Sequence, residues 1–171
     1  MANKQVLLDV LEKFISPYIN LTPHPVEDPD GNTLPALSNL GMGYVFEELI
    51  RKFNEENNEE AGEHFTPREI IKLMTHILFL PVKDQINKGS YLIYDPACGS
   101  GGMFVQSIKF IEAHHGNKKE VSIYGQEYTN TTYKLAKMNL AIRGISGNLG
   151  EKAANTFLDD QHKDLKADYI I

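Results

Sequence analysis

The stretch from Tyr91 to Phe104, which reads YLIYDPACGSGGMF, constrains the fold of this chain more than any other. It begins with a short run of aromatic and branched apolar residues, which is typical of a buried parallel strand. Asp95 stands where that strand is expected to end, and Gly99, Gly101 and Gly102 follow before an apolar helix opens. Strand, acidic residue, glycine turn and helix in this order predict the first unit of a nucleotide-binding α/β fold.

The glycine turn also excludes two common nucleotide sites. The dinucleotide fingerprint G-x-G-x-x-G would require a glycine at position 104, where this chain has Phe104. The Gly-Lys-Ser/Thr of a triphosphate-binding P-loop is absent as well. Glycines remain useful in such a turn because a side chain would keep the backbone away from a ligand, and because a tight turn can require a positive φ.

Composition bounds the class of protein. With 171 residues, the chain is long enough for one ordinary core and a small helical appendage. Its net charge of −6 argues against this chain gripping a phosphate backbone by itself, which calls for a basic patch. The single cysteine, Cys98, cannot form an internal disulfide, and no signal peptide or membrane-spanning run is present. We therefore expect a soluble, cytoplasmic protein.

The residues before the glycine turn predict helices joined by an irregular connection. Apolar residues recur at helical spacing over about residues 4–16 and again over 42–53. Residues 20–40 contain four prolines and the turn pair Asp30-Gly31, which predicts a long irregular connection. Residues 54–60 form a polar, acidic run that we expect to be solvated. We divide the chain into an N-terminal helical segment with a proline-rich loop, 1–60, and a cofactor-binding part, 61–171.

Thr66, Pro67 and Glu69 have the spacing of a capping box, with Thr66 as N-cap and proline at the first helical position. A helix is expected to follow toward Pro81. From these residues alone, Thr66 is either a helix cap or a cap that also contacts a ligand.

The residues after the turn predict further βα units. A helix is expected over about 104–111, a second strand over Val121–Gly125, and a helix over 130–143 that ends at Gly144. Residues 153–158 are expected to hold a short strand or strand end. Asp168–Ile171 predicts another strand of a partial parallel sheet.

Asp95 and Glu127 are the most informative pair of side chains. Each follows a predicted parallel strand, and consecutive strands of a βαβ unit end at the same edge of the sheet. An acidic residue after the second strand commonly accepts hydrogen bonds from ribose hydroxyls. Asp95 could hold a ligand ammonium or orient the glycine turn. The alternative is that both residues are helix N-caps.

Neither the cysteine nor the histidines are predicted to take part in catalysis or metal binding. Cys98 is expected to be a small loop residue rather than a nucleophile, because no histidine partner is evident. The histidines lack the spacing of metal ligands, so no metal site is predicted.

Five segments resemble, in the same order, the motifs of the amino-type DNA methyltransferases. They are FTPREIIKLM, DPACGSGGMF, YGQE, LAKMNLAIRG and ADYII. The resemblance is strongest to the modification subunit of type I restriction-modification systems, and it covers about residues 41–171. The preceding helix and proline-rich stretch resemble the end of that subunit's N-terminal helical region. Five ordered motifs make the resemblance far more specific than any one of them.

The resemblance implies a Rossmann-like, doubly wound methyltransferase fold that binds S-adenosyl-L-methionine. The segment His64–Arg68 would lie over the methionine part, and Asp95 with the loop Ala97–Gly102 would hold the amino-acid end. Glu127 would bind the ribose hydroxyls, and Asn155, where the family often has Asp, would lie near the adenine. The implied cofactor-binding residues are His64, Phe65, Thr66, Pro67, Arg68, Asp95, Ala97, Cys98, Gly99, Ser100, Gly101, Gly102, Glu127 and Asn155.

The resemblance further implies an adenine-N6 DNA methyltransferase. The family's catalytic Asn-Pro-Pro-aromatic motif follows directly on the segment that matches Asp168–Ile171, so it is expected just after Ile171. The 171 residues by themselves are accordingly expected not to methylate DNA, and to bind S-adenosylmethionine only weakly. Implied partners are DNA, a specificity subunit, a restriction subunit and a second copy of the modification subunit, with no membrane.

Two other functions remain open. A protein-glutamine or RNA methyltransferase could use the same glycine turn, and it would lack a pocket for a target base. A non-catalytic assembly subunit could use the same fold as a scaffold, and it would bind no S-adenosylmethionine.

Overall fold

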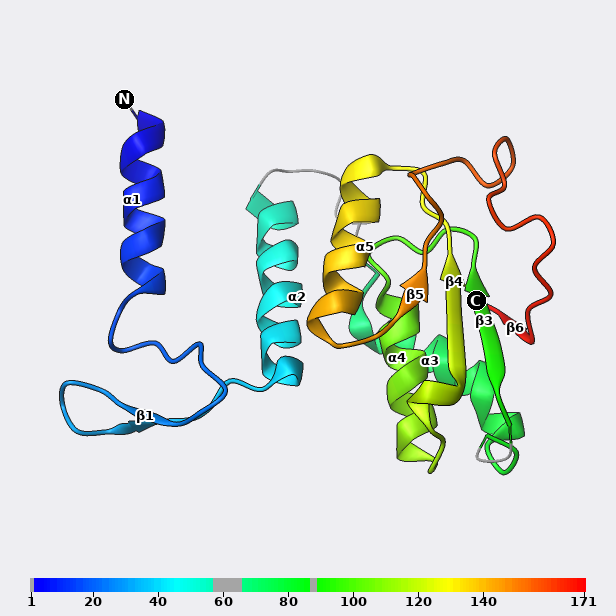
Figure 1. Cartoon of the computed structure of the whole chain (residues 1–171), viewed down its shortest axis with the longest axis horizontal. Helices are drawn as coiled ribbons and strands as arrows, with labels where there is room; N and C mark the ends of the chain where they lie inside the picture. The colour runs from blue at the N-terminus through cyan, green and yellow to red at the C-terminus, as the bar shows by residue number, and fades with distance from the viewer. Residues whose placement is uncertain (1, 57–65, 87–88) are drawn as a thin grey trace. The chain divides into compact units, whose positions relative to one another are not determined.

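The computed structural model describes residues 2–56, 66–86 and 89–171. The chain forms two compact units, Met1–Val45 and Phe46–Ile171 (Figure 1). Within the described ranges, no helix combines the length and the apolar character needed to cross a membrane.

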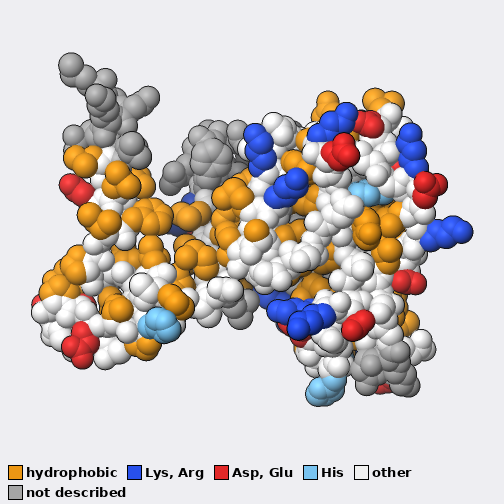
Figure 2. Space-filling model, viewed as in Figure 1, with side chains coloured by type: hydrophobic (Ala, Val, Ile, Leu, Met, Phe, Trp, Pro, Cys, Tyr) orange, Lys and Arg blue, Asp and Glu red, His pale blue; other side chains and the backbone are white. Residues whose placement is uncertain are grey.

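The first unit begins with helix α1 (Ala2–Phe14), which confirms the helix expected from the apolar spacing. The large apolar side chains described over residues 8–14 of this helix are exposed rather than packed into a core, as the orange patches along this part of the chain show (Figure 2). The exposed large apolar residues of this region are Leu8, Val10, Leu11, Phe14, Ile15, Tyr18 and Ile19.

The proline-rich connection is more ordered than predicted, because it contains a small β-hairpin. Strands β1 (Val26–Glu27) and β2 (Thr33–Leu34) pair antiparallel, with Val26 opposite Leu34. The Asp28 carboxylate holds the turn by accepting the Asp30 and Asn32 amides at 2.9 and 2.8 Å. Gly31 adopts a left-handed φ of 81°. Two-residue strands are too short to give a periodic signal, so the sequence pattern did not predict them.

Helix α2 (Asn39–Glu56) confirms the second predicted helix and extends into the acidic run, of which residues 57–60 lie outside the described residues. Helix α3 (Arg68–Phe79) leads into a 3-10 turn, η1 (Leu80–Val82). The buried side chains of α3 are Ile71, Thr75 and Phe79. The more conspicuous apolar stripe of Ile70, Leu73, Met74 and Ile77 is exposed.

The second unit contains a parallel four-stranded sheet in the order β5-β4-β3-β6 (Figure 1). Its strands are β3 (Tyr91–Asp95), β4 (Val121–Gly125), β5 (Gly147–Asn148) and β6 (Tyr169–Ile170). Asp95 is in register with Gly125, so β3 and β4 end side by side. Strand β4 lies on one side of β3 and β6 on the other, which makes the end of β3 the switch point where α/β proteins bind ligands. The predicted α/β class is confirmed.

Helix α4 (Gly102–Ala113) joins β3 to β4 by way of a 3-10 turn, η2 (Lys118–Glu120), and helix α5 (Asn130–Ile142) joins β4 to β5. Phe104, at the position where the dinucleotide fingerprint would need glycine, is fully buried in the core. A Cβ on Gly125 would lie 2.8 Å from the Phe104 ring. Gly125 therefore leaves room for the aromatic ring beneath the end of β4. Gly144 ends α5 with a φ of 63°, as predicted.

The long segment between β5 and β6 contacts the sheet through His162. His162 makes edge contacts with Tyr94 and Tyr124, at 5.7 and 5.4 Å between ring centroids. Its Nε2 also lies 2.9 Å from the Gly125 carbonyl oxygen. The prediction of a strand over residues 153–158 is wrong, because this segment forms turns. The strand that follows β4 in the chain is β5, Gly147–Asn148.

Candidate functional site

The glycine turn is the centre of the candidate site. Asp95 is the last residue of β3 and is buried, and its Oδ1 accepts the Ala97 amide at 3.0 Å. Gly99 and Gly101 adopt left-handed φ values of 53° and 80°, which other residues adopt only with strain. Gly101 is also the N-cap of α4. The turn therefore depends on glycine for its backbone conformation, as the sequence predicted.

Glu127 lies at the same edge, two residues beyond β4. Its Oε2 accepts the Gly99 amide at 3.0 Å, and its Oε1 accepts the Thr129 amide at 2.7 Å. The structure thus brings Glu127 to the glycine turn that follows Asp95, as the strand order predicted. Neither acid is a helix N-cap, because Gly101 and Thr129 occupy those positions. The N-cap alternative is therefore wrong.

Asp95 lies in a low-polarity environment, and the Glu127 carboxylate lies near it. Burial raises the pKa of the Asp95 carboxyl from its ordinary 3.8 to about 7. The Ala97 amide opposes this increase in pKa, and the negative charge of Glu127 adds to it. A cation beside Asp95 would stabilise the ionised carboxylate and lower this pKa, so the edge of the sheet favours a ligand that brings a positive charge.

Gln126 is a member of the site that the sequence interpretation did not single out. Its side chain is fully buried between the strand end and the segment after β5. Its Nε2 donates to the Asp159 carbonyl at 2.7 Å, and its Oε1 accepts the Gln161 amide at 3.1 Å. Its backbone pairs with Asp95 and Cys98, each at 2.9 Å. In the sequence, the only sign of this role was the position of Gln126, a polar residue between the last residue of the predicted strand and Glu127.

Asn155 is held at the same edge. The neighbouring Ala154 amide donates to the Glu127 carbonyl at 2.9 Å, and the Thr156 hydroxyl donates to the Pro96 carbonyl at 2.5 Å. Asn155 Oδ1 accepts the Phe157 amide at 2.9 Å. The structure therefore brings Asp95, the glycine turn, Glu127 and Asn155 together.

The Thr66–Arg68 segment differs from its prediction. Helix α3 begins at Arg68 with Pro67 as N-cap, and no side chain caps it. Pro67 has an extended ψ of 138°, so the helix begins one residue beyond the first helical position predicted by the capping box. The predicted N-cap role of Thr66 is wrong for this reason. His64 and Phe65, also predicted to bind cofactor, lie outside the described residues.

Helix α3 nevertheless packs next to the glycine turn. A Cβ on Gly102, the first residue of α4, would lie 2.8 Å from Ile71 Cδ1. Arg68 forms an ion pair with Glu47 of α2. Gly102 thus permits the first turn of α3 to approach the start of α4.

Cys98 is buried within the turn. Burial raises its thiol pKa far above the ordinary value, and the nearby charges of Asp95 and Glu127 act in the same direction. A protonated thiol is a poor nucleophile. This finding agrees with the interpretation of Cys98 as a small loop residue.

Comparisons with known proteins agree on one family. The model of the N-6 DNA Methylase family matches residues 38–171. The HindI methylase subunit, a type I restriction enzyme component of Haemophilus influenzae, is 44% identical over 130 residues, which are 76% of this chain and 28% of that protein. The MjaIX methylase subunit of Methanocaldococcus jannaschii is 36% identical over 76% of this chain and 22% of that protein. The chain therefore spans less than a third of the length of these relatives.

Solved structures show the same likeness. The methyltransferase subunit of a type I restriction-modification system from Streptococcus thermophilus matches with a TM-score of 0.60 and 29% identity, over 76% of this chain and 26% of that one. A modification subunit of a type I restriction enzyme from Vibrio vulnificus has a TM-score of 0.51 at 16% identity and shares the fold, over 82% of this chain and 40% of that one.

The raised pKa of Asp95 predicts a specific dependence of stability on pH. Between about pH 4 and pH 7 the folded protein retains the Asp95 proton while the unfolded chain loses it, so stability falls as pH rises. Asp95→Asn keeps an oxygen for the Ala97 amide and removes the titration. From about pH 4 to pH 8, wild type should lose roughly 3–4 kcal/mol more unfolding free energy than the variant in urea denaturation. Parallel pH profiles for the two proteins would contradict this environment for Asp95.

Proposed function

The chain belongs to the N-6 DNA methylase family, and on this premise we propose that it forms the cofactor-binding part of an adenine-N6 DNA methyltransferase subunit. The subunit would belong to a type I restriction-modification system. The observation that carries the proposal is the pair Asp95 and Glu127, which flank a left-handed glycine turn at the switch point of a parallel sheet. S-adenosylmethionine would be the cofactor.

The residues at this edge suit the charge and polarity of S-adenosylmethionine. Its amino-acid end carries an ammonium, and a cation beside the buried Asp95 would favour the ionised carboxylate. Each ionised carboxylate offers about four acceptor positions. One Asp95 oxygen accepts the Ala97 amide, so acceptor capacity remains for an ammonium.

Glu127 would bind the ribose. Its two oxygens each accept one backbone amide, from Gly99 and Thr129. The remaining acceptor positions would take the two ribose hydroxyls, and the two amide bonds would hold the carboxylate in place for them. Asn155 would approach the adenine, and the Thr66–Arg68 segment would lie over the methionine part.

When bound, the cofactor would supply the methyl group for transfer to the amino nitrogen of an adenine flipped out of the duplex. This chain's own residues would bind and orient the cofactor. The 171 residues contain no Asn-Pro-Pro-aromatic segment, so we assign no catalytic residue among them. The net charge of −6 is consistent with DNA being gripped mainly by other parts of a complex. Those parts would include a specificity subunit, a restriction subunit and a second modification subunit, in the cytoplasm.

Glu127→Ala should weaken S-adenosylmethionine binding by about tenfold or more, because hydrogen bonds to a charged acceptor contribute about 1.5–3 kcal/mol each. Isothermal titration calorimetry well below the unfolding temperature measures this change in affinity. Glu151→Ala, which removes an exposed acid, is the control and should bind normally. Equal affinities of a folded Glu127→Ala protein and wild type would refute the ribose assignment.

Methyl transfer tests the proposed activity directly. The 171-residue chain should transfer no methyl group to adenine-containing DNA, because nothing in it positions the target amine, and orientation can contribute about 7–11 kcal/mol. A polypeptide extended through an Asn-Pro-Pro-aromatic motif, together with its specificity subunit, should produce N6-methyladenine. Turnover by the 171-residue chain would show that catalytic residues lie within it. Methylation of RNA or of a protein glutamine by the extended form would favour the alternative substrate classes.

A further inference from the structure

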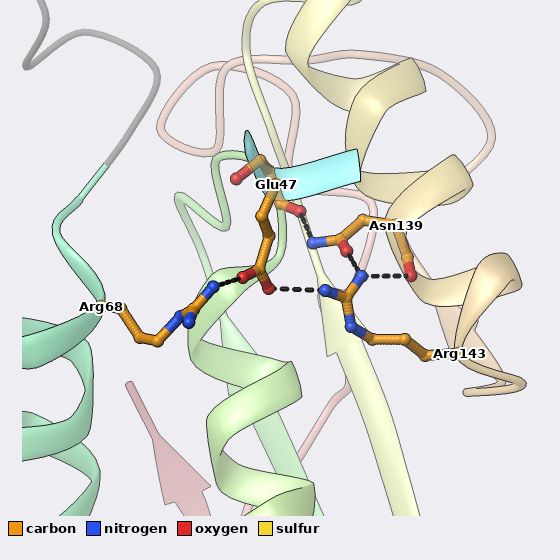
Figure 3. Close-up of polar contacts among 5 residues, drawn as sticks. Glu47, Arg68, Asn139 and Arg143 are labelled. Atoms are coloured by element: carbon orange, nitrogen blue, oxygen red, sulfur yellow. Dashed lines mark hydrogen bonds and ion pairs between the residues drawn. The ribbon is translucent and has the colours of Figure 1, made fainter. Parts of the chain in front are cut away.

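An ion-pair network lies beside the glycine turn and is not explained by cofactor contacts. Glu47 of α2 contacts Arg143, which follows α5, and Arg68, which begins α3 (Figure 3). Its Oε1 accepts from Arg143 Nη2 at 2.5 Å, and its Oε2 pairs with Arg68 Nη2. One carboxylate therefore connects α2, the start of α3 and the C-cap of α5, and all three residues lie within the second unit.

The network is buried enough to constrain its members. The side chain of Arg143 is 5% exposed and that of Glu47 is 17% exposed, whereas that of Arg68 is 46% exposed. A buried guanidinium without a counter-charge is strongly unfavourable, so the Glu47 carboxylate stabilises Arg143 in this position. The Arg68 contact is more exposed and is expected to be weaker.

Arg143 is connected to the glycine turn through Asn139. Its Nη1 donates to Asn139 Oδ1 and lies 3.3 Å from the Asn139 carbonyl oxygen. Arg143 thereby fixes which side of the Asn139 amide is the acceptor, and the other side, Nδ2, donates to the Ser100 carbonyl at 2.7 Å. Asn139 is itself buried, at 3% exposure.

The peptide between Ser100 and Gly101 is held from both ends. Its carbonyl accepts from Asn139, and its N–H donates to the Cys98 carbonyl at 2.8 Å. This peptide enters Gly101, whose φ of 80° sets the direction of the turn before α4. A change in its orientation would redirect the backbone around the proposed amino-acid end of the cofactor site.

We propose that Glu47 is a positioning residue for the cofactor site. Through Arg143 and Asn139 it fixes the glycine turn, and through Arg68 it holds the Thr66–Arg68 segment. This inference rests on the proposed function for the identity of the ligand, S-adenosylmethionine, but the network acts on the glycine turn whether or not a ligand is bound. Glu47 acts on the turn through other side chains, so it is not a catalytic residue.

Hydrogen exchange of the Gly101 amide in the ligand-free 171-residue chain tests the proposal. Glu47→Gln removes the charge that orients Arg143, so Gly101 should exchange about fivefold faster, the change expected for one lost hydrogen bond. Amides in the middle of β4, such as that of Ile123, report global stability. The ratio of the two exchange rates separates a local effect on the turn from a general loss of stability.

Two variants sharpen this test. Glu112→Gln removes an exposed acid that pairs with Lys118 at 3.6 Å, and it should leave the Gly101 exchange rate unchanged. Asn139→Ala removes the Ser100 contact directly. If Glu47 acts through Asn139, Glu47→Gln should add nothing to the exchange rate of the Asn139→Ala protein. Additive effects in the double variant would contradict this route.

S-adenosylmethionine affinity provides the second measurement. Glu47→Gln should weaken binding by about threefold to tenfold, in proportion to the change in Gly101 exchange. An unchanged Gly101 rate, or an equal increase at Gly101 and Ile123, would overturn the positioning role. Failure of wild type to bind S-adenosylmethionine would instead refute the proposed function, while the exchange experiment would still decide the role of Glu47.

Discussion

The parallel register of β3 against β4 is the constraint on which the candidate site depends. Because Asp95 is opposite Gly125, both strands end at one edge, and the residues just beyond them meet there. At this strand end Gly125 leaves room for the buried Phe104 ring, which a Cβ there would approach to 2.8 Å. The Glu127 carboxylate then reaches the amide of Gly99 across the strand ends. Packing inside the sheet thus determines where the polar groups outside it can lie.

The glycine turn is held from two directions without a ligand. Glu127 accepts the Gly99 amide from the side of the sheet, and Asn139 donates to the Ser100 carbonyl from the side of α5. Left-handed glycines alone would leave the turn flexible, because glycine has many accessible backbone conformations. These contacts reduce the ordering cost that a ligand would otherwise meet. The same contacts explain why polar residues are buried at this end of the fold.

Local signals in the sequence predicted much of this fold and part of the site. The apolar run before Asp95, the glycines after it and the position of Glu127 depend on near neighbours, so their roles follow from residue type and order. Contacts between distant residues were not predictable in this way. Glu47 and Arg143 are 96 residues apart, and the sequence around each residue gives no sign that the two side chains form an ion pair. The prediction of Thr66 as N-cap rested on the spacing of a capping box. It was wrong because the backbone of Pro67, with its extended ψ, takes the N-cap position instead.

In the proposed function, this edge of the sheet binds the cofactor. A crystal structure of the 171-residue chain with S-adenosylmethionine tests it most directly. The cofactor ammonium should lie within hydrogen-bond distance of the Asp95 carboxylate, and both ribose hydroxyls should donate to Glu127. Cofactor bound at another surface, or bound here with Glu127 directed away from the ribose, would contradict it.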